Sequence, residues 1–306
     1  MAETSYTYQI NAQQGEQLRP FLEERGFEMK PLAYGHFSAK RGKCGLHYYL
    51  SGKLLIQGKD AKEFIEFDFE PNILKEARLG YEEELNPEMF QPHFGIDESG
   101  KGDFFGPLVV AGVYVDKALA KKFLEMGVKD SKRIQSDQKA KDLAKEIKKC
   151  GPCWEVLSIG PERYNQLHQK IGNLNTLLAW GHAKVIENLH EKAPDCPRAL
   201  SDQFAHPSLI QRELKKKNIQ LQLQQRTKAE SDIAVAAASI LARAEFISRL
   251  ETIGKETGEK LGKGASFAVK DQALALARQR GLSFLRNITK THFKTFAEIA
   301  AQIENS

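Results

Sequence analysis

The stretch His93–Val115 reads HFGIDESGKGDFFGPLVVAGVYV and decides the fold of this chain. Its short apolar start ends at two adjacent carboxylates, Asp97 and Glu98. A glycine-rich turn with a lysine follows at once, and the apolar segment Leu108–Val115 is typical of a second strand. Carboxylates beside a flexible basic turn suit a site that holds a divalent metal ion and meets phosphate. We therefore expect a functional site where the first of these strands ends.

The composition is that of an ordinary folded protein with a mild positive charge. The chain has 306 residues, 41% of them hydrophobic, which is enough for one large or two modest domains. Its net charge of +5 leans slightly toward polyanionic partners. No apolar run approaches the roughly 18 residues of a membrane span, and the first residues lack the charged start and apolar core of a secretory signal. We therefore expect a cytoplasmic protein without a membrane segment.

The four cysteines are too few for a disulfide scaffold of this size. Cys150 and Cys153 form Cys-Gly-Pro-Cys, which on paper matches a thioredoxin-type redox pair. Such a pair works at the start of a helix, whereas here a predicted helix over 139–149 precedes it and a predicted strand over 154–159 follows it. A turn is therefore the favoured interpretation, and the lack of a second Cys-x-x-Cys gives little support to a zinc site.

A reversal of charge divides the chain. Between residues 26 and 59 six basic residues accompany one acid, and between residues 60 and 93 ten acids accompany three basic residues. The stretch Gly80–Pro92 adds Gly, Asn and two Pro to those acids, a composition typical of an exposed linker. The expected organisation is an N-terminal substrate-binding domain over 1–80, a linker over 81–92 and a catalytic domain over 93–306.

The N-terminal region has the pattern of a small α+β domain. Asn11 can cap a helix that Gly26 ends, and short strand patterns follow, the later ones separated by Gly-containing turns. The strands carry His47, Tyr48 and Tyr49 among lysines. A basic sheet with aromatic residues can bind nucleic acid by phosphate contact and stacking, but a solvated face with ordinary core aromatics is equally open. The expected strands are 5–10, 27–32, 37–41, 46–50 and 53–57, and the expected helices are 11–25 and 59–69.

The region after the linker has strand patterns first and then alternates strands with helices. This order predicts an α/β fold with a mixed sheet flanked by helices. The expected strands are 94–97, 108–115, 155–159, 198–201 and 219–224. The expected helices are 118–126, 139–149, 162–169, 176–191, 208–216, 230–251 and 271–280.

The glycine turn also resembles the phosphate-cradling loop of nucleotide hydrolases. The stretch Gly95–Gly102 nearly matches that motif, but Gly102 stands where a Ser or Thr hydroxyl should contact magnesium. Asp97 and Glu98 would also lie inside the anion cradle and repel phosphate. An NTPase, and with it a nucleotide cofactor, is therefore disfavoured.

Two further acids lie where catalytic groups are common. Asp202 follows the apolar strand 198–201, and strand ends often carry catalytic side chains in open sheets. Taken alone, such an Asp is more often a turn residue. Asp232 lies in the first turn of a predicted alanine-rich helix with apolar residues at helical spacing, and taken alone it would only complement the helix dipole. The small residues of this helix allow close packing on a sheet, which would bring Asp232 near the acids on the strands.

These blocks together resemble ribonuclease HIII, a bacterial type 2 ribonuclease H. The resemblance covers essentially the whole chain, and the Gly-Ile-Asp-Glu-Ser-Gly-Lys-Gly-Asp-Phe-Phe-Gly-Pro-Leu block is its most specific part. The sister family, ribonuclease HII, typically has Arg in this glycine turn and lacks the N-terminal extension. Lys101 and the roughly 90 residues before the block therefore favour HIII. The other matching segments are Asp130–Lys132, the strand end Ser201-Asp202 and Thr227–Asp232.

The resemblance implies a fold, a substrate and a chemistry. It implies a ribonuclease H-like domain preceded by a domain resembling half of the TATA-box-binding protein. It implies cleavage of the RNA strand of RNA/DNA hybrids, with 5′-phosphate and 3′-hydroxyl products, by a monomeric enzyme. Oxygen ligands suit Mg2+ or Mn2+, and two such ions during catalysis fit the hydrolysis of a phosphodiester. The catalytic and metal-binding acids that it implies are Asp97, Glu98, Asp202 and Asp232.

The resemblance also implies substrate contacts. The turn Gly100-Lys101-Gly102 would read the ribose 2′-hydroxyl through its backbone, and Lys101 could add a phosphate contact. Ser131 and Lys132 could face substrate phosphate, although a helix-capping role is nearly as well supported. HII enzymes carry a Gly-Tyr pair where this chain has Gly264-Ala265, so we expect weak cleavage at a single embedded ribonucleotide. A hybrid-binding module without catalysis is the main rival, and the presence of all four acids counts against it.

Overall fold

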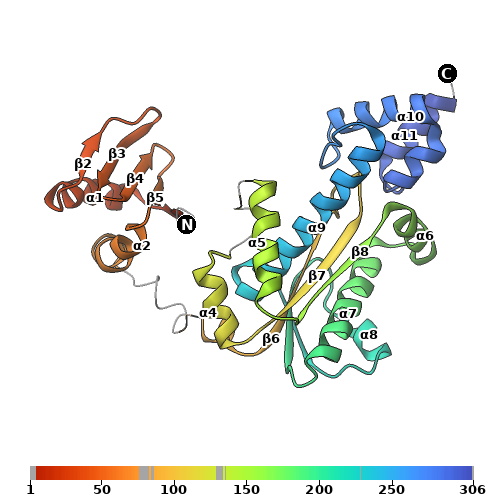
Figure 1. Cartoon of the computed structure of the whole chain (residues 1–306), viewed down its shortest axis with the longest axis horizontal. Helices are drawn as coiled ribbons and strands as arrows, with labels where there is room; N and C mark the ends of the chain where they lie inside the picture. Colours follow the sequence, from red (N-terminus) through yellow and green to blue (C-terminus); the bar gives the residue numbers. More distant parts are fainter. Residues whose placement is uncertain are drawn as a thin grey trace. The chain divides into compact units, whose positions relative to one another are not determined.

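The computed structural model describes residues 5–75, 83, 86–128, 134, 136–227 and 229–304. The chain divides into two compact units, Met1–Glu88 and Met89–Ser306 (Figure 1). In the part that the model describes, no helix is both long and apolar enough to cross a membrane.

The first unit contains an antiparallel five-stranded sheet in the order β1-β5-β4-β3-β2 (Figure 1). Along β4 buried residues alternate with partly exposed ones, so that one sheet face is covered and the other is open. Leu18 and Leu22 of α1 pack in one apolar cluster with Leu46 and Phe64. Asn11 accepts a hydrogen bond from the backbone of Gln14 and completes a capping box at the start of α1. The elements are β1 (Ser5–Gln9), α1 (Ala12–Glu24), β2 (Glu28–Lys30), β3 (Gly35–Arg41), β4 (Cys44–Tyr49), β5 (Lys53–Gln57), α2 (Ala61–Phe64) and the π-helix η1 (Ile65–Leu74).

The second unit is built on a mixed five-stranded sheet in the order β10-β9-β6-β7-β8. The central strand β6 pairs antiparallel with β7 and parallel with β9, and β10 continues the sheet parallel to β9. The prediction of a mixed sheet flanked by helices is confirmed. The strands are β6 (His93–Ser99), β7 (Leu108–Val115), β8 (Trp154–Ile159), β9 (Arg198–Asp202) and β10 (Gln222–Arg226).

Helices cover both faces of this sheet (Figure 1). Along β7, Val109 and Val113 belong to the apolar cluster of α9, whereas Val110 between them belongs to the cluster of α7. Because strand side chains alternate between faces, α9 and α7 lie on opposite sides of the sheet. The helices are α4 (Lys117–Glu125), α5 (Asp137–Lys149), α6 (Pro161–Ile171), α7 (Leu174–Lys192), α8 (Ser208–Lys216), α9 (Ile233–Thr257), α10 (Phe267–Ile288) and α11 (Lys294–Glu304), with short 3-10 helices η2 (Pro87–Phe90) and η4 (Ala229–Ser231).

The start of α9 approaches the sheet at a glycine. A Cβ atom added to Gly95 of β6 would overlap the backbone of Ala234 and Val235, in the first turn of α9. Only glycine leaves room for this approach. The close packing that the small residues of α9 predict is therefore present, and it fixes the position of the residue that begins the helix.

The structure differs from the sequence-based expectations at several elements. The helix expected over 59–69 is the short α2 followed by the π-helix η1, and the helix expected over 230–251 begins only at Ile233, after η4, and ends at Thr257. The fifth strand begins at Gln222 instead of residue 219, because its pairing with β9 starts where Gln222 faces Arg198. The helix expected over 271–280 extends over Phe267–Ile288, with Gly281 in a non-helical conformation inside it. The C-terminal helix α11 was not predicted, although Phe296 and Ile299 of α11 are buried at helical spacing.

Candidate active site

Three of the four predicted acids lie near the C-terminal ends of two neighbouring strands of the mixed sheet. Asp97 and Glu98 end β6, and Asp202 ends β9. Ile96 faces Ser201 in the parallel pairing of β6 with β9, so that Asp97 and Asp202 are the next residues on neighbouring strands. The fourth acid, Asp232, is the N-cap of α9 and is brought to β6 by the close approach at Gly95.

Asp97 lies in a crowded and negatively charged environment. Its Oδ1 atom accepts a hydrogen bond of 2.8 Å from the backbone N–H of Glu98, and the side chain of Ser239 on α9 also hydrogen-bonds to it. Burial, followed by the charges of Glu98 and Asp202, raises the pKa of Asp97 to about 7. The carboxyl group therefore keeps its proton around neutral pH until a cation compensates the surrounding charge.

Glu98 is held between a histidine and a lysine. Its Oε2 atom lies 3.0 Å from Nε2 of His182, which belongs to α7 and is fully buried. Its Oε1 atom lies 3.9 Å from Nζ of Lys101 in the glycine turn. One oxygen is thus fixed from inside the protein, and the other faces a partly exposed cation.

Asp232 has the same division between its two oxygens. Oδ1 accepts hydrogen bonds from the backbone of Ala234 and Val235 and lies 3.0 Å from Nε2 of the buried His93. Oδ2 is buried and has no hydrogen-bond partner among the described residues. The Arg226 guanidinium lies 3.8 Å from Oδ2. A buried carboxylate oxygen without a hydrogen bond is costly unless a cation compensates it.

Asp202 is partly exposed beside these groups. Its Oδ1 atom accepts a hydrogen bond of 3.2 Å from the backbone N–H of Ala229, in the short helix η4 before α9. Arg226 faces Asp202 in the pairing of β10 with β9. Arg226 therefore lies near two of the acids, although no local sequence pattern singled it out.

The donor set fits a hard divalent cation. Among the described residues no three His, Cys, Asp or Glu side chains already form a metal-binding group. The four carboxylates nevertheless offer only oxygen ligands, which suit Mg2+ or Mn2+ better than a soft metal. The carboxylates crowded around Asp97 and the Asp232 oxygen without a hydrogen bond both favour a cation at this site. Metal binding would then release the proton of Asp97.

The glycine turn lies directly after the acids, and buried neighbours hold its backbone in place. Gly100 has a φ of +88°, and a Cβ atom there would overlap the carbonyl oxygen of Pro107, so the fold itself requires glycine. Gly102 is different, because no described atom lies within 4 Å of a Cβ built there.

The ammonium group of the buried Lys290 donates to the carbonyl oxygens of Asp103 and Gly106, just after the glycine turn, at 2.8 Å. Burial lowers the pKa of Lys290 to about 7.

Sequence reasoning missed several residues that support the acids and the turn. His93, His182 and Lys290 are fully buried polar residues. His93 and His182 lie beside or within an apolar run of the sequence, whereas Lys290 lies among polar neighbours. For the two histidines that pattern was the available signal, but it does not identify a partner. Ser131 and Lys132, the other predicted substrate contacts, lie outside the described residues.

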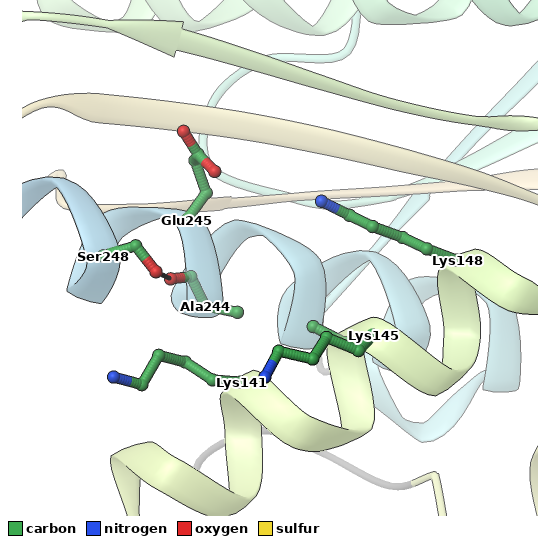
Figure 2. Close-up of a pocket in the computed structure, with 7 residues that line it drawn as sticks. Lys141, Lys145, Lys148, Ala244, Glu245 and Ser248 are labelled. Carbon is green, nitrogen blue, oxygen red and sulfur yellow. Dashed lines mark hydrogen bonds between the residues drawn. The ribbon is translucent and has the colours of Figure 1, made fainter.

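A separate shallow groove between α5 and α9 contains none of the four acids (Figure 2). Lys141 pairs with Glu251 at its rim, and Lys145 pairs with Asp142. Lys148 lies over the ring of Trp154. Each of these lysines thus has a partner within the protein, and the groove lies apart from the four acids. Its lining residues are Lys141, Ala144, Lys145, Lys148, Ala244, Glu245 and Ser248.

The chain is similar to known ribonucleases over nearly its whole length. The family model for ribonuclease HII matches residues 94–296. Ribonuclease HIII of Protochlamydia amoebophila (strain UWE25) is 43% identical over 289 residues, which cover 94% of each chain. Ribonuclease HIII of Chlamydia pneumoniae is 44% identical over 93% of this chain and 94% of the relative.

Solved structures of ribonucleases are also similar to this chain. The crystal structure of Bst-RNase HIII in complex with Mn2+ has a TM-score of 0.68 at 28% identity and covers 99% of this chain and 100% of that one. Aquifex aeolicus RNase H3 has a TM-score of 0.56 at 27% identity, with coverage of 94% and 100%. The sheet order and these similarities agree, and the chain belongs to the ribonuclease HIII group of the type 2 ribonuclease H family and is a ribonuclease.

Proposed function

We propose that the protein is an endonuclease that hydrolyses the RNA strand of RNA/DNA hybrids and leaves 5′-phosphate and 3′-hydroxyl ends. The observation that supports this proposal is that strand register sets Asp202 beside Asp97 and Glu98, and that the start of α9, which Asp232 caps, packs against β6 at Gly95, close to a bare glycine turn. The named relatives are ribonucleases, and one related structure contains Mn2+. A monomeric state, the lack of a nucleotide cofactor and a cytoplasmic location stay predictions.

The four acids would hold two Mg2+ or Mn2+ ions. When bound, such ions would supply activation of a water molecule and stabilisation of the leaving 3′ oxygen. The residues of the chain suit this site in three ways. Asp97 would give up its proton, Glu98 would exchange its contact with Lys101, and Asp232 would exchange its contact with Arg226. Lys101 and Arg226 then become available for substrate phosphates.

Recognition of RNA must depend on the 2′-hydroxyl, since this group distinguishes the two strands of a hybrid. Gly102 supports this role better than Gly100 does. The fold requires glycine at position 100, whereas no described neighbour requires it at position 102. A glycine without a structural reason, beside the acids, leaves backbone open to a ribose.

Gly102→Ala should therefore fold as the wild type does and yet bind the hybrid poorly. The added methyl group meets no described atom of the protein but would lie between the backbone and the ribose. We expect KM for a hybrid to rise about tenfold, a change of about 1.4 kcal/mol, with an unchanged unfolding temperature. Gly151→Ala, at a turn with equally open space around it, is the control. Unchanged KM in Gly102→Ala would remove this position from substrate recognition.

The N-terminal unit would add affinity for the duplex. The side chains of Lys40 and Lys53 are exposed, and His47 and Tyr49 lie on the open face of the same sheet. Basic and aromatic groups on one open face suit a nucleic-acid backbone. This role of the domain, like its expected boundary at residue 80, stays a prediction.

Replacement of both Lys40 and Lys53 by Gln should weaken hybrid binding and flatten its salt dependence. Each lost phosphate contact should reduce the slope of log K against log salt by about 0.9. Fluorescence anisotropy at several salt concentrations, in Ca2+ to prevent cleavage, measures this slope. The turnover number at saturating substrate should stay the same, because neither lysine belongs to the acid site. An unchanged slope would show that this face does not contact the duplex.

Matched duplexes test the proposed function itself. The protein should cleave a labelled RNA/DNA hybrid in Mn2+ or Mg2+, and it should leave DNA/DNA and RNA/RNA duplexes of the same sequence intact. Binding of the hybrid without cleavage in either metal would favour the rival interpretation of a hybrid-binding module.

A further inference from the structure

Two fully buried histidines lie behind the acids, one for each of two carboxylates. His182 of α7 places Nε2 3.0 Å from Oε2 of Glu98. His93, at the start of β6, places Nε2 3.0 Å from Oδ1 of Asp232. Both imidazole rings are inaccessible to solvent. They can therefore act on the site only through these carboxylates.

The second nitrogen of each ring is anchored on an acceptor. Nδ1 of His93 lies 2.6 Å from the carbonyl oxygen of Gln91, which can only accept a hydrogen bond. Nδ1 of His182 lies 3.1 Å from the hydroxyl of Ser201, and that hydroxyl donates its proton to the carbonyl oxygen of Asp202. Ser201 must then accept from His182. In both rings Nδ1 faces this acceptor and Nε2 faces a carboxylate oxygen, so both nitrogens act as donors, and the two hydrogen bonds fix the orientation of the ring.

Packing restrains the rings as well. The ring of Phe204, from the loop after β9, lies 4.9 Å from the His182 ring at an angle of 56°. His182 lies on a helix whose neighbouring residues Ala179, Ala183 and Ile186 are fully buried. Rigid rings of this kind hold a carboxylate in one orientation more firmly than a solvated partner does.

Each carboxylate is oriented in the same manner. The buried histidine takes one oxygen, and the other oxygen faces a partly exposed cation, Lys101 for Glu98 and Arg226 for Asp232. The side chains of these cations are 37% and 48% exposed, so they can move away, whereas the histidines cannot. The oxygen that faces the cation is thus the one that a divalent ion can reach.

We propose that His182 and His93 are positioning residues that present one oxygen each of Glu98 and Asp232 to divalent metal. The inference rests on the proposed function and names two residues outside the four acids. Ser201 supports His182 through its hydroxyl, and the carbonyl of Gln91 supports His93. Such outer partners of metal ligands typically change metal affinity by about 10–100-fold when they are removed.

Two amide substitutions separate positioning from general packing. The side-chain amide of Gln places a nitrogen at the ε position, where it can still donate to the carboxylate, whereas Asn places one only at the δ position. His182→Gln should bind Mn2+ within about threefold of the wild type, and His182→Asn should bind it about 10–100-fold more weakly. His93→Gln and His93→Asn should show the same difference through Asp232.

Mn2+ affinity is measured on the full chain without substrate, by electron paramagnetic resonance of the free ion, beside the unfolding temperature in EDTA. Raising Mn2+ should restore much of the cleavage rate of His182→Asn. Equal affinity in folded His182→Asn and wild type would overturn the proposal, as would equal losses in the Asn and Gln variants. If a variant at position 182 does not fold, His93→Gln and His93→Asn are compared instead. If the wild type itself neither binds Mn2+ nor cleaves a hybrid, the proposed function fails first; if it does both, only the positioning role is at risk.

Discussion

Asp97→Asn should lower hybrid cleavage at least about 1,000-fold and, in the absence of metal, make the protein more stable at pH 8. The loss of cleavage follows from the loss of a carboxylate charge at the centre of the acid site, where metal-based stabilisation contributes several kcal/mol. The gain in stability follows from the cost of burying the charged carboxylate of Asp97, to which the repulsion from Glu98 and Asp202 adds. An amide of the same shape removes this repulsion.

The raised pKa of Asp97 predicts that the metal-free protein loses stability as the pH rises. The pKa of Asp97 is raised from 3.8 to about 7, so the folded protein binds more protons than the unfolded chain between these values. The stability that this proton provides is complete below about pH 4 and is lost as the pH rises through 7. Loss of the whole contribution corresponds to on the order of 2–4 kcal/mol. Asp97→Asn should flatten this decline.

Urea unfolding in EDTA between pH 4 and 8 measures both effects. Asp137→Asn is a suitable control: although burial opposes them, hydrogen bonds from Lys263 and Arg243 lower the pKa of Asp137. That substitution should slightly destabilise the protein above about pH 4, which is the opposite sign. A folded Asp97→Asn protein with near wild-type turnover would remove Asp97 from the mechanism, and an unchanged pH profile would contradict its raised pKa.

Gly95→Ala should destabilise the protein by about 3 kcal/mol or prevent its folding. The new methyl group would overlap backbone atoms of Ala234 and Val235, which cannot rotate away as a side chain can. The first turn of α9 would have to move off β6, and overpacking of this kind typically costs 1–3 kcal/mol or more. Because Asp232 begins α9, any folded fraction should also lose cleavage and Mn2+ affinity.

Chemical unfolding and Mn2+ titration of Gly95→Ala test this coupling. Gly151→Ala, which meets no described atom within 4 Å, should behave as the wild type in both. Wild-type stability together with wild-type turnover in Gly95→Ala would show that the helix start can shift without disturbing the acids, contrary to the arrangement proposed here.

The sequence alone identified the first pair of acids but not their companions. Asp97 and Glu98 stand at the end of a strand beside a distinctive turn, so the local pattern was sufficient. Asp202 and Asp232 each had an ordinary local explanation, and only the resemblance to a family singled them out. The structure gives a physical reason in each case. Strand register brings Asp202 beside Asp97, and the packing of α9 against Gly95 brings Asp232 close to β6.

The two interpretations of Asp232 are compatible. Its Oδ1 atom caps the start of α9, where a carboxylate also complements the helix dipole as the local interpretation expected, while Oδ2 has no hydrogen-bond partner among the described residues. A capping bond uses one oxygen and leaves the other for a metal ion. Local sequence patterns could not reveal this division, since it depends on His93, which is 139 residues away along the chain.

Contacts between distant segments account for the other omissions. His182 meets Glu98 across 84 residues of sequence, and Lys290 meets Asp103 across 187. The periodicity of a helix or strand shows only that such a residue is buried. The identity of its partner depends on the order of strands in the sheet and on the packing of helices over it, which no local pattern contains.

The central claim is metal-dependent cleavage of the RNA strand of a hybrid. Determining which strand is cut, and in which metal, tests this claim most directly. A hybrid labelled on the RNA strand in one reaction and on the DNA strand in another is incubated with the protein in Mn2+, in Mg2+ and in EDTA, and the ends of the fragments are analysed. The proposed function predicts cleavage of the RNA strand alone, dependent on metal, with 5′-phosphate and 3′-hydroxyl ends. Cleavage that persists in EDTA, that leaves a 2′,3′-cyclic phosphate or that cuts the DNA strand would contradict it.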